Sequence, residues 1–170
     1  SSAMREGTLG KPNHFAKLMN LKESIANAHA NGALLDESRR ILDEWLDKDF
    51  LPDWALASLN ELVEAEDWEE LNNRFYQYIT FGTGGMRGRT ISYKVTRAEK
   101  GQSGEKGTPA HAAVGSNLLN DFNLVRATIG AYRYTREFLD IAGRGYEIPQ
   151  LVIAHDVRHY SRHFCELCAS

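Results

Sequence analysis

The chain has 170 residues, of which 42% are hydrophobic and 25% are charged, enough to bury the core of about one domain. Its formal net charge of −3 argues against a general nucleic-acid binder, since such proteins carry a basic surface. No run reaches the roughly 18 apolar residues that span a bilayer, and residues 1–13 lack the apolar core of a signal peptide, so we expect a cytoplasmic protein that contacts no membrane.

Residues 15–78 show the apolar spacing that is typical of α-helices. One stripe consists of Leu18, Leu21, Ile25 and His29. Asp36 is placed to cap the helix that follows it. Two more helices are predicted over residues 54–63 and 68–79. We therefore expect an α-helical N-terminal extension over residues 1–79.

Acidic side chains gather in the last part of this helical region. They are Glu61, Glu64, Glu66, Asp67, Glu69 and Glu70. We expect them to form a solvated face, with those near helix starts well placed for the helix dipole. A partner-binding role for the same face is the alternative.

Residues 81–90 form the most glycine-rich stretch, Phe-Gly-Thr-Gly-Gly-Met-Arg-Gly-Arg-Thr. Glycine lets the backbone turn sharply and bring its N–H groups close to a ligand, and arginine offers a planar fork that matches phosphate oxygens. The pattern therefore predicts an anion-binding loop. The alternative is a tight turn flanked by solvated arginines.

Two familiar nucleotide-binding loops do not fit this stretch. The dinucleotide fingerprint needs glycine at the sixth position, which is Arg87 when counted from Gly82, and residues 68–79 read as helix rather than strand. The P-loop needs Gly-Lys followed by Ser or Thr, and no Gly-Lys is placed that way.

The second half of the chain alternates helix and strand signals. Residues 94–111 read as a polar loop. Asn123 is placed to cap a helix ending near residue 141, residues 150–154 are typical of a buried parallel strand, and another helix starts near Ser161. We therefore expect an α/β fold over residues 80–170, with a mixed or parallel sheet and helices on both faces.

Side chains just after the predicted strand fall where such sheets place ligands. These are His155, Asp156 and Arg158. We consider Asp156 and Arg158 as phosphate-site residues, with a purely structural ion pair as the alternative.

Histidines and cysteines near the C-terminus suggest a metal site but do not complete one. His155, His159 and His163 recur every four residues, yet only the last two would share a helix face, so we expect surface or capping roles. Cys165 and Cys168 have no second pair with which to build a four-cysteine zinc site. We expect both thiols on one partly buried helix face, and a redox role is the alternative.

Several segments resemble the α-D-phosphohexomutases, that is, the phosphoglucomutases and phosphomannomutases. Residues 81–88 match the family motif Phe-Gly-Thr-x-Gly-x-Arg-Gly at every fixed position. Residues 35–46 and 69–76 are similar to the helical N-terminal extension of the larger phosphoglucomutases, which also handle pentose phosphates. Downstream resemblances follow in the family's order, over residues 115–120, 125–130 and 151–158.

The chain also departs from the family pattern. Leu118 stands where the family usually has arginine, and residues 94–109 resemble an insertion. The family's serine loop, Thr-Ala-Ser-His-Asn-Pro, and its magnesium motif, Asp-x-Asp-x-Asp-Arg, do not occur in these residues. The resemblance therefore implies the front portion of a larger enzyme. In it, residues 80–170 begin the first α/β domain, and the phosphoserine, the Mg²⁺ ligands and the remaining domains lie outside this chain.

The resemblance implies phosphoryl transfer between two hydroxyls of one hexose or pentose phosphate, as in the conversion of glucose 1-phosphate to glucose 6-phosphate. A phosphoserine donates its phosphate, and glucose 1,6-bisphosphate is the intermediate. Thr83, Gly84, Gly85 and Arg87 would then lie beside the phosphoserine, with Arg87 on the phosphate. This chain alone would be inactive. The alternative is a non-catalytic module that binds a phosphosugar or another protein.

Overall fold

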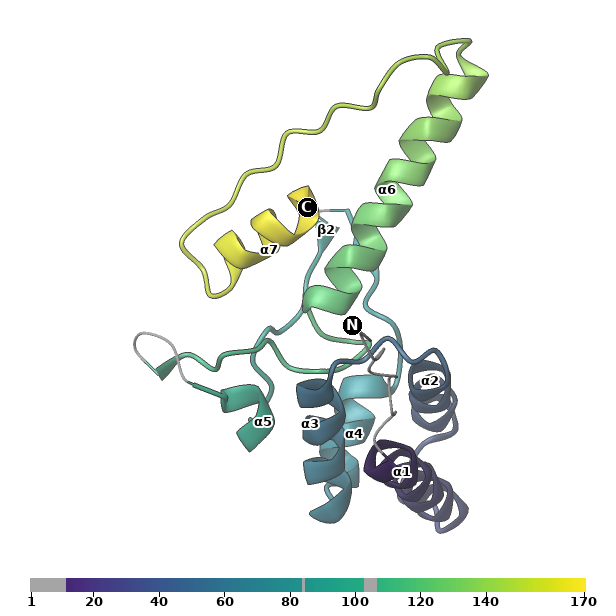
Figure 1. Cartoon of the computed structure of the whole chain (residues 1–170), viewed down its shortest axis with the longest axis vertical. Helices are drawn as coiled ribbons and strands as arrows, with labels where there is room; N and C mark the ends of the chain where they lie inside the picture. The colour runs from purple at the N-terminus through teal and green to yellow at the C-terminus, as the bar shows by residue number, and fades with distance from the viewer. Residues whose placement is uncertain (1–11, 84, 103–106) are drawn as a thin grey trace, which may run out of the picture.

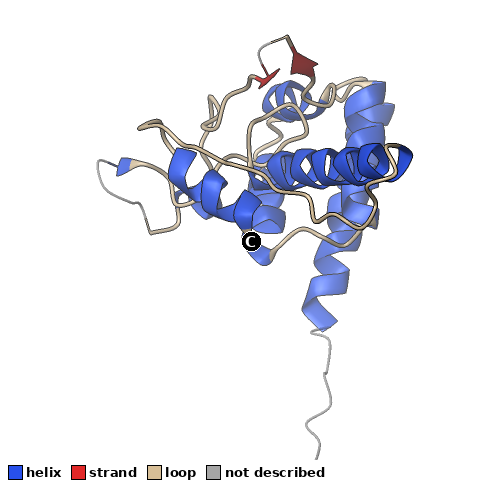
Figure 2. Ribbon diagram, turned by 90° about the horizontal axis from the view of Figure 1, so that it is seen from above, coloured by secondary structure: helices blue, strands red, loops and turns tan. Residues whose placement is uncertain are grey.

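The computed structural model describes residues 12–83, 85–102 and 107–170 (Figures 1 and 2). Its elements are α1 (Pro12–Ala30), α2 (Asp36–Asp47), α3 (Asp53–Glu64), α4 (Trp68–Phe75), β1 (Phe81–Gly82), β2 (Gly85–Met86), α5 (Arg97–Lys100), α6 (Asp121–Ile141) and α7 (Ser161–Ala169). Helices α1 to α4 form a bundle, α6 projects away from it, and the chain then arches back to place α7 beside α6 (Figure 1).

The bundle holds the main hydrophobic core. Apolar side chains on α2 recur at helical spacing and are buried there: Ile41, Leu42, Trp45 and Leu46. The Trp45 ring makes edge contacts with Phe75 of α4 at 5.4 Å and with Phe122 at 5.6 Å between ring centroids. Because Phe122 belongs to α6, this contact fastens the start of α6 to the bundle.

Most helix positions confirm the predictions, and the ends of the helices account for the differences. Asp36 is the first residue of α2 rather than its cap, and its carboxylate lies 2.7 Å from His29 Nε2. Helix α4 ends at Phe75 instead of residue 79, because the next residues bind another segment: the Ile79 N–H donates to the Ser116 carbonyl at 2.8 Å.

Helix α6 begins three residues earlier than the predicted helix. Asn120 is the cap, since its side-chain oxygen accepts a hydrogen bond from the Asn123 N–H at 3.0 Å. A short helix, α5, also interrupts the predicted loop. Thr96 and Glu99 form a capping box at its start, each side chain bonding to the other's backbone N–H.

The sheet that the structure describes consists of β1 and β2 alone. Residues 151–154 run as an extended segment outside any strand, with Leu151 71% and Val152 95% exposed. The prediction of a buried strand there is not met, since no described strand lies beside the segment to accept its backbone hydrogen bonds. The α/β class and the boundary between residues 79 and 80 stay predictions.

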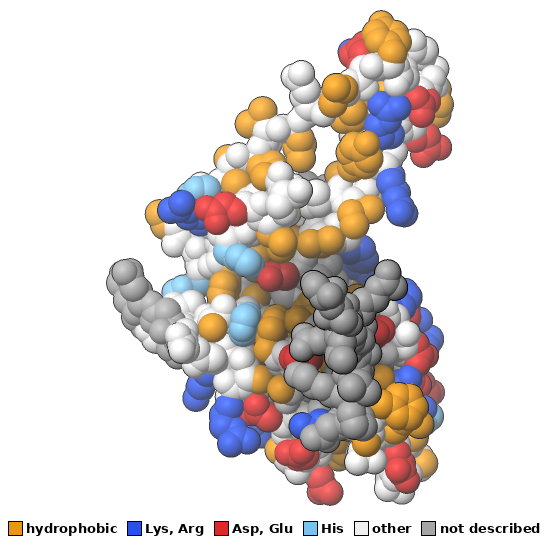
Figure 3. Space-filling view, viewed as in Figure 1, with side chains coloured by type: hydrophobic (Ala, Val, Ile, Leu, Met, Phe, Trp, Pro, Cys, Tyr) orange, Lys and Arg blue, Asp and Glu red, His pale blue; other side chains and the backbone are white. Residues whose placement is uncertain are grey.

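Exposed apolar side chains occur along α6 and the arching segment after it (Figure 3). They include Ile129, Tyr132, Tyr134, Phe138, Ile141, Tyr146, Ile148 and Leu151. Tyr134 and Phe138 share one side of this helix and are 70% and 54% exposed. So many large apolar side chains exposed on one helix and the segment after it are typical of surfaces that contact another protein element.

Candidate anion-binding site

The glycine-rich stretch folds into a short β-hairpin at the edge of the molecule (Figure 2). Strands β1 and β2 pair antiparallel, with Phe81 opposite Met86 and Gly82 opposite Gly85, so Thr83 follows β1 at the start of the turn. Thr83 is exposed there, and Gly84 lies outside the described residues. Gly85 has a φ of +94°, a conformation that favours glycine.

The two arginines of the loop differ in what they contact. Arg87 is exposed and forms no hydrogen bond or ion pair with any residue in the described ranges. The Arg89 guanidinium instead lies 3.5 Å from the centroid of the Tyr93 ring and donates a hydrogen bond to its hydroxyl. Arg87 therefore has its donor fork open to a ligand, whereas that of Arg89 is partly engaged.

Gly88 allows the chain leaving the hairpin to pack closely against its support. A Cβ atom at this position would lie 2.7 Å from Ile79 Cδ1 and 3.2 Å from the Leu119 nitrogen. The first contact would force the end of the Ile79 side chain to shift and the second is a tight contact with backbone, so a side chain at this position would crowd the approach.

The chain after the hairpin is hydrogen-bonded to residues 113–119, which we call the support segment. The Leu119 N–H donates to the Arg89 carbonyl and the Ala113 N–H to the Thr90 carbonyl, both at 2.8 Å. These bonds set the direction in which the chain leaves the hairpin.

Two buried asparagines hold the support segment in place. The Asn120 side-chain amide donates to the carbonyls of Ala113 at 2.9 Å and Gly115 at 2.8 Å. The Asn123 amide lies within 3.1 Å of three carbonyls, including that of Gly115. Leu118 is 5% exposed and packs inward, so it brings no charge to the site.

A buried polar cluster, which was not predicted from the sequence, lies beneath the support segment. Arg74 is fully buried, and its guanidinium bonds to Glu70 at 2.7 Å and to Glu99 at 2.5 Å. Ser58, also buried, donates its hydroxyl to Glu99 at 2.9 Å. Each buried charge in this cluster has an oppositely charged partner, as buried ions require.

Glu70 corrects the prediction of a solvated acidic face. It is 4% exposed, whereas Glu64, Glu66 and Glu69 on the same stretch are exposed. The signal that could have found it is its four-residue spacing from Arg74 on α4. The Thr96-x-x-Glu99 pattern of a capping box marks the other acidic partner.

The pKa of Glu99 is held below its ordinary value. Burial alone would raise this pKa, but the hydrogen bonds and charge of Arg74, together with the N–H groups of Thr96 and Val114, outweigh it. Glu99 is therefore ionised at neutral pH and forms a charged pair with Arg74.

Asp156 and Arg158 form an ion pair at 2.7 Å on the surface, with the Arg158 side chain 87% exposed. The Arg158 N–H and guanidinium, together with the Ser161 hydroxyl, lower the pKa of Asp156 to about 2. No hydrogen bond or ion pair within the described part of the chain joins either residue to the hairpin. The structure therefore gives this pair local partners, and its role at a phosphate site stays a prediction.

The C-terminal histidines each have a separate neighbour. His163 Nε2 lies 2.9 Å from an Asp121 oxygen, His159 Nδ1 lies 3.3 Å from the Thr108 hydroxyl, and His155 Nδ1 lies 3.2 Å from the Asp156 carbonyl. Among the described residues, no group of at least three His, Cys, Asp or Glu side chains is arranged to hold a metal ion.

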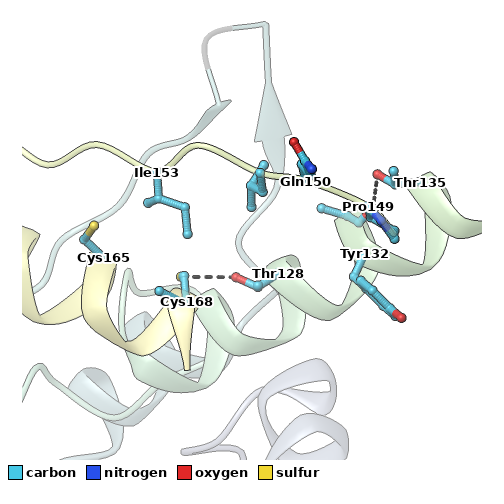
Figure 4. Close-up of a pocket in the computed structure, with 11 residues that line it drawn as sticks. Thr128, Tyr132, Thr135, Pro149, Gln150, Ile153, Cys165 and Cys168 are labelled. Carbon is cyan, nitrogen blue, oxygen red and sulfur yellow. Dashed lines mark hydrogen bonds between the residues drawn. The ribbon is translucent and has the colours of Figure 1, made fainter. Parts of the chain in front are cut away.

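Cys165 and Cys168 line one cleft of about 530 Å³ between α6, α7 and the extended segment (Figure 4). The Thr128 hydroxyl donates to the Cys168 sulfur at 3.1 Å, and Ile153 lies on the opposite wall. Both thiols are half-buried, as predicted for one helix face.

Comparison of the chain with protein-family models, with curated proteins and with solved structures finds no match. The resemblance to the phosphohexomutases therefore stays a prediction from the sequence. None of the helices in the described ranges combines the length and apolar character needed to cross a bilayer.

Proposed function

We propose that this chain contributes the phosphate-binding loop of a cytoplasmic phosphohexomutase that acts on hexose or pentose phosphates. The observation that carries the proposal is the open guanidinium of Arg87 at the end of a solvent-facing glycine hairpin. Arginine in this setting binds phosphate oxygens through two parallel charge-assisted hydrogen bonds.

In phosphoryl transfer, negative charge spreads over the equatorial oxygens of the transferring group. Arg87 would stabilise that charge, and the hairpin N–H groups would add oriented donors. The phosphoserine, Mg²⁺ and the remaining domains of the polypeptide complete the proposed enzyme, with glucose 1,6-bisphosphate as intermediate. The resemblance places the Mg²⁺ ligands outside this chain, so the residues given a role here are those of the hairpin.

Titration of the chain with inorganic phosphate and with glucose 1,6-bisphosphate tests the loop directly. We expect the amide resonances of Gly82, Gly85 and Arg87 to shift on binding. Arg87→Ala should weaken binding by about 10- to 100-fold, the loss of one charge-assisted contact, and Arg87→Lys should be intermediate.

Arg89→Ala is the matched control, because the Arg89 guanidinium already contacts Tyr93. It should leave the affinity for phosphate within about twofold of wild type, since a nearby arginine acts only by screened attraction. Equal losses in the two variants would mean that the loop attracts anions by net charge without a specific site.

The second candidate function is a non-catalytic module that binds a phosphosugar or another protein. The exposed apolar surface of α6 and the arching segment favours a protein partner. The two candidates differ in a mutase assay of the longest natural polypeptide that carries this segment. Turnover of glucose 1-phosphate supports the enzyme, and binding without turnover supports the module.

A further inference from the structure

The buried Arg74 lies where three parts of the chain meet. Its side chain is on α4, yet its guanidinium also donates to the Val114 carbonyl at 3.2 Å and to the Lys94 carbonyl at 2.6 Å. Val114 belongs to the support segment, and Lys94 follows the hairpin along the chain. One guanidinium therefore bonds both to the support segment and to the chain that follows the hairpin.

The backbone of Arg74 contacts the support segment as well. Its carbonyl accepts a hydrogen bond from the Asn117 N–H at 3.0 Å. A Cβ atom on Gly115 would lie 2.8 Å from this carbonyl oxygen, so the two backbones are in close contact. Movement of Arg74 would therefore displace the support segment directly.

The carboxylate partners of Arg74 also link the helical bundle to the residues that follow the hairpin. Glu70 accepts a hydrogen bond from the Ser92 hydroxyl, close to the end of the hairpin stretch. Glu99 accepts the Val114 N–H at 3.1 Å and the Ser58 hydroxyl at 2.9 Å. The cluster thus joins α3 and α4 to the residues that follow the hairpin.

We infer that Arg74 is a positioning residue for the hairpin: it bonds to the support segment, which in turn bonds to Arg89 and Thr90 and so fixes the direction of Arg87. The helical bundle is then the base on which the anion loop is oriented. What the hairpin binds rests on the proposed function, but the positioning itself does not.

Amide NMR spectroscopy of the chain tests this inference with Arg74→Met, which keeps the length of the side chain and removes its hydrogen bonds. We expect the amides of Gly82, Gly85 and Arg87 to shift in the absence of any ligand. Exchange of the Leu119 amide with solvent should accelerate by about tenfold or more, because its bond to the Arg89 carbonyl opens more often. In Arg74→Lys, which keeps the charge and some of the hydrogen bonds, the amide shifts and the acceleration of exchange should both be smaller than in Arg74→Met.

Leu42→Ala is the control, because it lowers the stability of the bundle and keeps the hydrogen bonds between Arg74 and the support segment. Leu42 is fully buried in the bundle and belongs to its hydrophobic core. When Leu42→Ala and Arg74→Met are compared at the same free energy of unfolding, Leu42→Ala should leave the hairpin amide resonances unshifted. Equal displacement in Leu42→Ala and Arg74→Met, or unmoved hairpin amides in Arg74→Met, would overturn the inference.

Ser58→Ala serves if Arg74→Met does not fold. It removes the hydroxyl that bonds to Glu99 and to Thr96 while keeping both charges, so we expect a smaller displacement of the same amides. Unmoved hairpin amides in this variant would also overturn the inference.

A titration with inorganic phosphate separates this inference from the proposed function. If wild-type protein binds phosphate, Arg74→Met should weaken binding several-fold, although Arg74 cannot touch the ligand. If wild-type protein does not bind phosphate, the proposed function fails, and the displacement of the hairpin amides alone decides the positioning role.

Discussion

Arg87 and Arg89 carry the same charge two positions apart and have different surroundings. The Arg89 guanidinium contacts Tyr93, whereas that of Arg87 has no partner among the residues that the structure describes. A ligand that reaches the hairpin would therefore meet one donor fork that is ready to bind and one that must first leave a ring.

In a complete enzyme that bears this segment, Arg87→Ala should lower turnover by roughly a hundredfold or more. A charge-assisted contact made mainly at the transition state is worth on the order of 2 to 4 kcal/mol. Arg87→Lys should be intermediate, and the thermal midpoint should barely move, because the side chain is exposed. Steady-state kinetics and thermal melting measure both.

Arg89→Ala is the internal comparison and should keep most of the activity. If Arg87→Ala retains turnover near that of wild type, or loses it only in step with unfolding, then the glycine hairpin is a turn without a ligand.

Glu99 should make the protein less stable in acid. Its pKa is lower in the folded protein than its ordinary value of 4.5, so the unfolded chain binds more protons as the pH falls through that range. The free energy of unfolding that comes from this group is present above pH 4.5 and is lost as the pH falls through the folded pKa.

Urea denaturation of wild type and Glu99→Gln at pH 7 and at about pH 3.5 measures this effect. We expect Glu99→Gln to be less stable at pH 7, because Arg74 loses a charged partner, and to change less between the two pH values. The same pH dependence in both proteins would exclude Glu99 as the source.

Along the hairpin and α6, two glycines should respond to alanine in opposite ways. Gly88→Ala places a methyl group against Ile79 and the Leu119 backbone, and should destabilise the protein by about 1 to 3 kcal/mol. Gly130 lies in α6 with no atom within 4 Å of a Cβ, so Gly130→Ala should stabilise the helix by about 0.5 to 1 kcal/mol. Thermal melting of the two variants tests both signs.

The elements show which parts of the fold the sequence could predict. Apolar spacing located α3 within one residue at each end, because helical spacing is a local property. The cap of α6 was assigned to Asn123 instead of Asn120, because both residue types cap helices and only the packed support segment draws the Asn123 side chain inward.

The candidate site was predicted in part for the same reason. The hairpin turn follows from its glycines, which need no tertiary contact to turn the chain. The Arg74 cluster was not predicted, since Arg74 and Glu99 are 25 residues apart and their burial depends on how α4 meets α5. Residues 150–154 have the composition of a strand, but a strand forms only beside another one.

For the molecule as a whole, the exposed face of α6 leads us to expect self-association. Purified chain should bind a hydrophobic dye and form oligomers at micromolar concentration, because aromatic and aliphatic side chains there lie open to solvent. Tyr134→Ser with Phe138→Ser should reduce both effects. Dye fluorescence and light scattering provide the measurements, and a wild-type monomer without dye binding would contradict the expectation.

The pairing of Arg74 with Glu99 also bears on how the protein is made. Arg74 leaves the ribosome 25 residues ahead of Glu99. Until Glu99 follows, Glu70 on the same helix is the charged partner of Arg74, and the guanidinium N–H groups that bond to Glu99, Val114 and Lys94 in the folded protein have no protein acceptor. We therefore expect the helical bundle, although first in the sequence, to complete its packing around Arg74 only after the glycine hairpin and Glu99 have been synthesised.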